Sequence, residues 1–441
     1  MVSDWNETSL GKLLNFSNGK KSPERIECSE FAVYGSNGVI GHSDSANSKE
    51  KSIIIGRVGT YCGSVYYSPD RAWVTDNAIK AFALGENSAL FLYFLLKDLN
   101  LNNWREGSGQ PLINQTILKN IEVVVPHPEE QKAIAQILGS LDDKIELNRQ
   151  MNETLEAMAQ ALFKSWFVDF DPVIDNAIKA GKLIPDELAA RAKLRKNIIK
   201  KENPEIQSLF PDEFEFTEEL GWIPKGWRVS TLGKESDFTN GYAFKSKELT
   251  TDSTNAFHVF KMGHIKRGGG FNYDGTKSYL PTDRAKGLEK YLLKKGDLLM
   301  AMTDMKSSMA LLGHTALMSE NDKYLVNQRV GRLSVKENAA LNYPYIYIYS
   351  NLDSTITELR SRANSGVQVN LSTAEIKATN IIVPNKSTHK LFDETALQLF
   401  NKIFANDELS RQLTNLRDTL LPKLMSGEIR VSDAAAMVED A

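Results

Sequence analysis

The stretch PEEQKAIAQILGSLDDKIELNRQMNETLEAMAQALFKSWF, residues 128–167, decides the fold because it reads as one long amphipathic helix. Pro128 suits the first turn of a helix, and the acidic pair Glu129 and Glu130 suits its positive N-terminal end. Its apolar residues follow one another alternately three and four residues apart, as in the seam of packed helices, and one polar residue, Asn148, interrupts this seam. The apolar residues of this seam are Ile134, Leu138, Leu141, Ile145, Leu155, Leu162 and Trp166.

The same helix occurs a second time at a constant offset of 258 residues (406 minus 148), so that Asn148 matches Asn406. The offset holds without a gap from Gln110 and Gln368 to Leu162 and Leu420. A single buried helix also shows an apolar stripe, but two copies with asparagine at one seam position favour two helices packed together. We expect an antiparallel pair in which Asn148 and Asn406 face each other and fix the register.

The regions that precede the two helices also begin alike, at an offset of 222 residues (227 minus 5). The matching residues are Trp5, Leu10, Gly11, Lys12, Phe16, Asn18 and Gly19 with Trp227, Leu232, Gly233, Lys234, Phe238, Asn240 and Gly241. The start and the end of each half correspond while the middle does not, which indicates a duplicated frame carrying two different inserts.

We therefore predict an α+β protein in which two mixed α/β domains are separated by two long helices, with an internal pseudo-twofold. The predicted parts are a first domain (1–128), a first long helix (129–170), a connector (171–220), a second domain (221–386), and a second long helix with a tail (387–441). Strands are expected at 51–58, 63–67, 118–126, 297–302, 330–335 and 381–383, a hairpin at Asn37-Gly38, and helices at 89–96, 186–201 and 344–362.

The composition is that of an ordinary globular protein: 441 residues, a net charge of −3 and two cysteines. Residues 1–5 lack the pattern of a signal peptide, and the most apolar run, 90–96, is too short to cross a bilayer, so we expect a cytoplasmic protein with no membrane contact. Residues 221–384 carry 22 basic and 15 acidic groups, whereas 127–220 carry 12 and 19. This distribution suits a protein that meets DNA on one face and protein on another, although an ordinary solvated surface is equally consistent with it.

Three stretches resemble the specificity subunits of type I restriction–modification systems. They are Gly107–Pro111 followed by Ile121–Pro126 and Glu130-Gln131, then Phe163–Pro172 (FKSWFVDFDP), and Glu219–Trp227 (ELGWIPKGW). The order of region, helix, region and helix matches as well. The second half departs from this pattern, with Val367-Gln368-Val369 where the first half has Gly-Gln-Pro.

The resemblance implies a non-catalytic reader of double-stranded DNA with one target-recognition domain for each half of a split, asymmetric site. It also implies docking of two methyltransferase subunits, through which restriction subunits join. The chain itself would bind no cofactor and no metal. S-adenosylmethionine, ATP and magnesium would belong to the partner subunits. The alternatives are a self-contained DNA modification enzyme with an unrecognised active site, and a coiled-coil scaffold that reads no bases.

Signs of chemistry in the chain itself are weak. No GxxxxGK[ST] loop is present, and Asn342–Tyr345 (NYPY) departs from the Asn-Pro-Pro-aromatic motif of amino-methyltransferases and opens a predicted helix. Glu130-Gln-Lys132 has a nuclease-like spacing, but its place in a first helical turn favours capping. His258 and His264 favour phosphate contact over metal binding, and Gly268–Gly270 favours a turn over a phosphate cradle.

Base reading needs forked donors and amides, and phosphate contact needs Lys, Arg, Ser and main-chain N–H groups. An ordinary surface role is the alternative for any one residue. The candidates in the first half are Lys20, Lys21, Ser36, Asn37, Arg57, Tyr61, Arg105, Ser108 and Gln110. The candidates in the second half are Lys245, Lys247, Lys261, His264, Lys266, Arg267, Thr303, Lys306, Asn327, Gln328, Arg329, Arg362 and Gln368.

Overall fold

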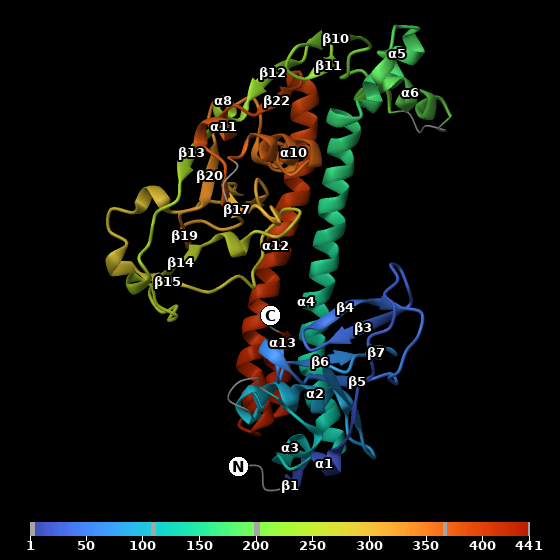
Figure 1. Ribbon diagram of the computed structural model, residues 1–441, viewed down its shortest axis with the longest axis vertical. Helices are drawn as coiled ribbons and strands as arrows, with labels where there is room; N and C mark the ends of the chain where they lie inside the picture. The colour runs from blue at the N-terminus through green and yellow to red at the C-terminus, as the bar shows by residue number, and fades with distance from the viewer. Residues whose placement is uncertain (1–4, 107–111, 198–202, 365–367, 440–441) are drawn as a thin grey trace. The chain divides into compact units, whose positions relative to one another are not determined.

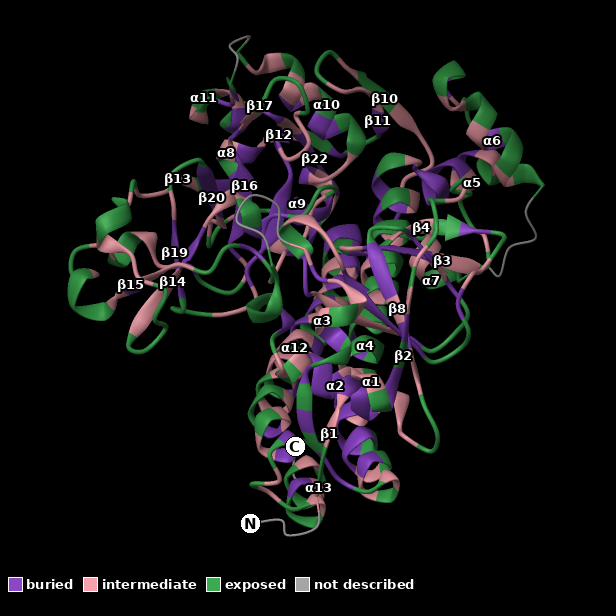
Figure 2. Ribbon diagram, turned by 60° about the horizontal axis from the view of Figure 1, so that its bottom comes forward, coloured by how far each residue is buried: buried purple, intermediate pink, exposed green. Residues whose placement is uncertain are grey.

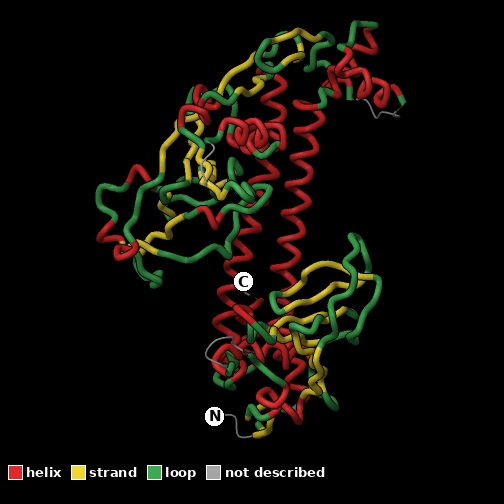
Figure 3. Tube along the Cα trace, in the orientation of Figure 1, coloured by secondary structure: helices red, strands yellow, loops and turns green. Residues whose placement is uncertain are grey.

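The computed structural model describes residues 5–106, 112–197, 203–364 and 368–439. The chain divides into unit 1, residues 1–151 and 406–441, and unit 2, residues 152–405. Two long helices, α4 (Pro128–Phe163) and α12 (Lys386–Met425), contribute one segment to each unit and stand out in Figures 1 and 3. Each unit therefore combines a globular α/β part with a segment of both helices.

Within unit 1 the two helix segments run antiparallel. The Asn148 side-chain amide donates to the hydroxyl of Ser410 at 3.2 Å, and Arg417 lies 2.6 Å from Asp142. Residues nearer the N-terminus of α4 thus contact residues nearer the C-terminus of α12. Asn148 and Asn406 are both buried, and the Ser410 hydroxyl donates to the Asn406 carbonyl, so Ser410 joins the two asparagines.

The helix segments of unit 2 are antiparallel in the same sense. The Asn152 side-chain amide donates to the Ile403 carbonyl at 3.3 Å, and the rings of Phe163 and Phe392 lie 5.6 Å apart. The antiparallel pairing predicted from the repeated seam is thus confirmed in each unit.

Unit 1 contains a four-stranded sheet of order β2-β8-β5-β6, a three-stranded sheet of order β4-β3-β7 and the pair β1-β9. β8 is made of buried and intermediate residues (Figure 2), whereas in β2 the buried Leu14 and Phe16 alternate with more exposed residues. The strands are β1 (Asn6–Ser9), β2 (Leu14–Asn18), β3 (Phe31–Gly35), β4 (Gly38–Ser43), β5 (Ser52–Gly56), β6 (Val65–Ser68), β7 (Trp73–Val74), β8 (Ala78–Ala83) and β9 (Glu122–Val125). The helices besides α4 and α12 are α1 (Leu10–Leu13), η1 (Gly59–Tyr61), α2 (Ala89–Asp98), η2 (Leu101–Trp104), α3 (Gln115–Lys119) and α13 (Val431–Glu439).

Unit 2 contains a four-stranded sheet of order β13-β20-β16-β18, a three-stranded sheet of order β15-β14-β19 and the pairs β10-β11, β12-β22 and β17-β21. The strands are β10 (Phe214–Thr217), β11 (Gly221–Pro224), β12 (Arg228–Thr231), β13 (Ser236–Asn240), β14 (Ala256–Phe260), β15 (Tyr279–Pro281), β16 (Leu298–Ala301), β17 (Thr303–Met305), β18 (Thr315–Leu317), β19 (Tyr324–Val326), β20 (Val330–Val335), β21 (Gln368–Asn370) and β22 (Asn380–Val383). The helices are η3 (a π-turn, Lys164–Val168), α5 (Asp171–Ala180), η4 (Asp186–Leu188), α6 (Ala189–Lys196), α7 (Pro204–Gln207), α8 (Leu232–Glu235), η5 (Ser246–Glu248), η6 (Met262–His264), η7 (Thr282–Arg284), η8 (Glu289–Tyr291), α9 (Tyr343–Ser350), α10 (Asp353–Arg362) and α11 (Thr373–Lys377).

The two globular parts share the topology of their two sheets, including their middles, and unit 2 adds the strand pairs β10-β11 and β17-β21. β3 pairs parallel with β7 and antiparallel with β4, as β14 does with β19 and β15. The four-stranded orders β2-β8-β5-β6 and β13-β20-β16-β18 correspond strand for strand. The two inserts, which differ in sequence, therefore share one fold. Loops of different length shift the offset from 222 to 258 in steps, and a buried strand accepts many apolar sequences, so no single offset reveals the likeness.

Other predictions needed smaller corrections. The helix expected at 344–362 is two helices, α9 and α10, since α9 ends at the Asn351 cap. The strand expected at 118–126 is shorter, because Leu118 and Lys119 belong to α3, and it is not fully buried, since Val124 is 46% exposed. Part of the helix expected at 186–201 lies outside the described residues, and the part inside them is η4 and α6.

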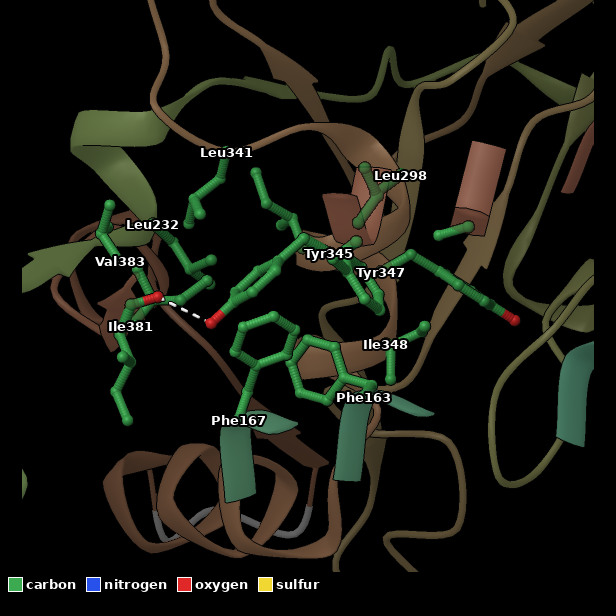
Figure 4. Close-up of a cluster of buried hydrophobic side chains, with 14 of the residues drawn as sticks. Phe163, Phe167, Leu232, Leu298, Leu341, Tyr345, Tyr347, Ile348, Ile381 and Val383 are labelled. Atoms are coloured by element: carbon green, nitrogen blue, oxygen red, sulfur yellow. Dashed lines mark hydrogen bonds between the residues drawn. The ribbon is translucent and has the colours of Figure 1, made fainter. Parts of the chain in front are cut away.

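The core of unit 2 is built where α4 ends (Figure 4). Phe163 and Phe167 pack edge-on against Tyr345, with ring centroids 4.8 and 4.9 Å apart. The Tyr345 side chain is fully buried, and its hydroxyl donates to the Ile382 carbonyl at 2.9 Å, so its polar atom is satisfied. This cluster fastens the helix pair to the adjoining sheet.

The motif residues of 163–172 and 219–227 lie in the same core. Trp166 and Phe170 are buried, and the Phe170 ring lies 6.0 Å from that of Trp227. Asp171 accepts hydrogen bonds from Arg191 at 2.7 Å, which ties α5 to α6. The aromatic residues of these motifs therefore hold the fold together.

Candidate nucleic-acid interface

In unit 1, three loops meet at one end of the four-stranded sheet. They follow β2, follow β5, and join β7 to β8, and main-chain hydrogen bonds connect them. The Gly19 N–H donates to the Ala78 carbonyl at 3.0 Å, and the Arg57 N–H donates to the Asn77 carbonyl at 2.9 Å. The segment at 112–113 joins them, because the Ile113 N–H donates to the Arg57 carbonyl at 3.1 Å. We call this network the loop frame.

The loop frame depends on glycine where two backbones approach closely. A Cβ atom on Gly19 would lie 1.9 Å from the Thr75 carbonyl oxygen, and one on Gly56 would lie 2.3 Å from the Tyr61 carbonyl oxygen and 2.7 Å from that of Ser36. Only glycine fits such contacts. The Gly56 contact also brings the β3–β4 hairpin turn at Ser36-Asn37 beside the loop frame.

Cationic groups gather at the same end of the sheet. The Cys62 thiol donates to the Arg57 carbonyl at 3.3 Å. Burial raises the pKa of this thiol, while Arg105 nearby acts in the opposite direction. Burial lowers the pKa of Lys80, and Lys20 adds to this effect by repulsion. The loop frame of unit 1 therefore lies among several basic side chains.

Unit 2 repeats the loop frame bond for bond. The Gly241 N–H donates to the Val330 carbonyl at 3.1 Å, and the Met302 N–H donates to the Arg329 carbonyl at 2.9 Å. A Cβ atom on Gly241 would lie 2.0 Å from the Asn327 carbonyl oxygen. The counterpart of the hydrogen bond from Ile113 to Arg57 is the one from the Leu371 N–H to the Met302 carbonyl, at 2.9 Å. The two units thus present the same backbone surface with different side chains.

Most of the candidate residues lie exposed or half-buried on these loops or beside them. In unit 1 these are Lys20, Lys21, Ser36, Asn37, Arg57, Tyr61 and Arg105, while Ser108 and Gln110 lie outside the described residues. In unit 2 they are Lys245, Lys247, Lys261, Lys266, Arg267, Lys306, Asn327, Gln328, Arg329, Arg362 and Gln368. The Lys261 ammonium donates to the Ser278 hydroxyl at 2.7 Å, and Arg362 pairs with Glu358, so both side chains already have partners.

Two candidates do not fit a surface role. His264 is fully buried, and its ring Nδ1 accepts from the Lys261 N–H at 3.0 Å inside an aromatic cluster. Thr303 is 8% exposed, and its hydroxyl points to the Met262 sulfur at 3.2 Å. The phosphate contact expected of His264 and the DNA contact expected of Thr303 are therefore corrected, because neither side chain reaches the surface.

Sequence reasoning missed the turn at 75–77. Its counterpart 327–329 stands out in the sequence because Asn-Gln-Arg is rich in forked polar groups, whereas Thr-Asp-Asn lies at the shifted offset of 252 residues (329 minus 77). Comparing the segments VTDNA and VNQRV at that offset would have revealed the match. Asp76 and Asn77 are both exposed.

The groups considered for catalysis have structural roles. Gln131 is 1% exposed; its side chain accepts from the Ser88 N–H at 3.1 Å and donates to Asn87 and Pro126, so it holds the start of α2 instead of capping its own helix. Asn342 caps α9 through the Tyr343 N–H, as its predicted place at a helix start requires. Gly268–Gly270 form a turn, as predicted, with all three φ angles positive.

The described ranges contain neither a cluster of metal-ligating side chains nor a helix that could span a bilayer. There, no three His, Cys, Asp or Glu side chains come together as metal ligands would. Nor does any helix within those ranges combine the length and hydrophobicity that crossing a bilayer requires.

Comparison with known proteins gives one consistent result. The family model described as "Type I restriction modification DNA specificity domain" matches residues 2–157 and 224–416. The specificity subunit of the MjaIX type I restriction enzyme of Methanocaldococcus jannaschii is 27% identical over 350 residues, which is 78% of this chain and 69% of the relative. The specificity subunit of the HindI type I restriction enzyme of Haemophilus influenzae is 27% identical over 352 residues, 72% of this chain and 71% of the relative.

A solved structure is similar in fold. The crystal structure of the S subunit of a type I restriction–modification system from M. genitalium matches with a TM-score of 0.54 at 17% sequence identity and covers 96% of each chain. This likeness extends over both units and supports the α+β architecture described above.

Proposed function

Because the chain belongs to the family of type I restriction–modification DNA specificity proteins, we propose that its two units each read one half of a two-part, non-palindromic DNA site. The observation that carries this proposal is the shared loop frame: one backbone arrangement occurs twice, with Lys20 and Arg57 in unit 1 where unit 2 has Tyr242 and Met302. Two loop frames with the same backbone arrangement but different side chains suit the reading of two half-sites that differ in sequence. As a specificity subunit the chain is not itself catalytic.

The partners follow from the same proposal. Two methyltransferase subunits dock on the chain, restriction subunits join through them, and the assembly acts in the cytoplasm. S-adenosylmethionine, ATP and magnesium are used by those partners. Exposed apolar side chains on α4, Leu147 at 58% and Met151 at 37%, supply a surface of the kind that a partner helix covers.

We further propose that the long helices set the number of unread base pairs between the half-sites. α4 and α12 have 36 and 40 residues, which corresponds to roughly 54 and 60 Å at about 1.5 Å per residue. Both helices contribute to both units, so a change in their length changes the connection between the two readers.

The experiment that tests this function is a domain exchange read out by long-read sequencing of methylated host DNA. Residues 1–126 are replaced by the equivalent region of a relative with a different target, and residues 127–441 are kept. The expected result is a new sequence in one half-site with the other half-site and the gap unchanged. A change in both half-sites, or in neither, contradicts the assignment of one half-site to each unit.

A second measurement addresses the alternative of a self-contained enzyme. The purified chain is irradiated with labelled S-adenosylmethionine, alone and with its methyltransferase partner. We expect label on the partner and none on this chain. Label on this chain would support the alternative.

A further inference from the structure

One turn holds the same position in both loop frames and carries different side chains. This reading turn is defined as residues 75–77 in unit 1 and 327–329 in unit 2. It closes with equivalent bonds: Ala78 N–H to Thr75 at 3.0 Å, and Val330 N–H to Asn327 at 3.2 Å. Its last residue accepts from the loop after β5 or β16, as described above. The backbone of the turn is thus fixed from two sides in each unit.

The side chains at the tip of the reading turn face solvent. Asp76 and Asn77 are exposed in unit 1, and Gln328 and Arg329 are exposed in unit 2. Within the described residues, no side-chain hydrogen bond or ion pair is formed by Asn77 or by Arg329. Both side chains therefore have their donors available to a ligand.

Arg329 also has an uncommon backbone conformation. Its φ angle is +72°, in the left-handed region that a non-glycine residue adopts at a cost of about 1 kcal/mol or more. The Met302 N–H that donates to its carbonyl, together with the Gln328 N–H that donates to Tyr242 at 2.8 Å, holds this conformation. A strained, exposed arginine fixed by the surrounding backbone is typical of a residue whose direction matters for binding.

We propose that the reading turn is the base-reading element of each unit: Arg329 reads a guanine in one half-site, and Asn77 reads an adenine in the other. An arginine fork matches guanine O6 and N7, and an asparagine amide matches adenine N6 and N7. The turn holds the same position and is closed by equivalent main-chain hydrogen bonds in both units, although φ is positive at Arg329 and not at Asn77. Different side-chain donors are therefore presented from equivalent places in the two units. This inference rests on the proposed function, because it assigns the residues through which each unit reads DNA.

The test uses the full chain assembled with its methyltransferase subunits, after the target has been found by sequencing methylated host DNA. Methylation rates are measured on duplexes that carry every single-base change in both half-sites. The main variant is Arg329→Asn, because asparagine tolerates a positive φ. We expect the preference for guanine at one position to fall by roughly 5- to 150-fold, with the other half-site unaffected.

The reciprocal variant is Asn77→Ala, which should relax one adenine position in the other half-site only. Arg329→Gly is a second variant at the strained position, since glycine accepts a positive φ freely and keeps the turn foldable. The matched control is Lys286→Asn, which removes the same charge from an exposed residue of unit 2 beyond β15. At that point β15 ends beside the start of β14, whereas the reading turn follows the C-terminal end of β19.

The outcomes distinguish a failure of this inference from a failure of the proposed function. Loss of selectivity at one base position with Arg329→Asn or Arg329→Gly supports the inference. An even loss of rate at all positions, as expected for a phosphate contact, overturns it, and so does unchanged selectivity. If the unaltered complex itself shows no sequence preference in either half-site, the proposed function fails before the reading turn is examined.

Discussion

The side-chain amide of Asn148 in α4 lies 3.2 Å from the hydroxyl of Ser410 in α12, and Ser410 in turn donates to the main-chain carbonyl of Asn406 at 2.8 Å. A polar contact therefore stands inside an apolar seam whose flanking positions, Leu141 and Leu413, are almost fully buried. Such a contact specifies which residues lie opposite one another and costs stability.

Replacing both Asn148 and Asn406 by Leu should raise the free energy of unfolding by about 1 kcal/mol, because a buried amide is exchanged for a packed apolar side chain. Ser410 keeps its bond to the carbonyl of residue 406, so no hydroxyl is left unsatisfied. Thermal unfolding measures the gain, and crosslinking between cysteines placed on α4 and α12 measures the register. A lower melting temperature, or a register as well defined as before, would contradict the role of the asparagines.

Removing one heptad from each long helix, residues 145–151 and 407–413, should shorten the pair by about 10 Å while keeping the seam in phase. These segments are opposite each other in unit 1, as the Asn148–Ser410 contact requires. At about 3.4 Å per base pair, the unread gap should shrink by roughly three base pairs. Sequencing of methylated DNA reports the gap, and an unaltered gap with both half-sites intact would refute the helices as the ruler.

Tyr345→Phe should destabilise unit 2 by about 1 to 2 kcal/mol, because it removes the hydroxyl that donates to the buried Ile382 carbonyl. The cost arises from an acceptor left without a partner, since the ring and its packing against Phe163 and Phe167 remain. Denaturant unfolding measures the change. Tyr61→Phe is the control, because Tyr61 is 52% exposed. If both substitutions lowered the free energy of unfolding equally, the role of the buried hydroxyl would be contradicted.

Stability should decrease as the pH falls from about 6.5 to about 4. Burial lowers the pKa of His258 to about 4, with added repulsion from His264, Lys277 and Lys261. The unfolded chain then binds more protons than the folded chain in this window, so acidification favours unfolding, by on the order of 2 kcal/mol at the lower end. His258 stacks on Tyr324 with ring centroids 4.9 Å apart, so His258→Phe should preserve the packing and reduce the slope of stability with pH.

Thermal unfolding across this pH range provides the measurement. Replacing the exposed His42 of unit 1 by Phe should leave the slope as it is in the unaltered chain. An unaltered slope in the His258→Phe protein would show that this ring does not carry the pH dependence.

The residues alone determined the helix pair, its antiparallel sense, the start and end of each repeat and the family resemblance. These properties depend on local patterns: a seam with a fixed period, Pro128 at a helix start, and an asparagine recurring at one seam position. The same local patterns could not place Thr303 or His264, because burial is set by strands distant in sequence. Nor could they align Asn77 with Arg329, since unequal loops shift the offset between the halves.

Only the tertiary structure decided that the two dissimilar middles share one topology and one loop frame. The physical reason is that a sheet constrains its main chain far more than its side chains. Gly19 and Gly241 keep their places because a Cβ atom would collide with a neighbouring carbonyl. The exposed residues Asp76, Asn77, Gln328 and Arg329 are free to differ because their side chains face solvent. A reader of two unlike half-sites requires that freedom.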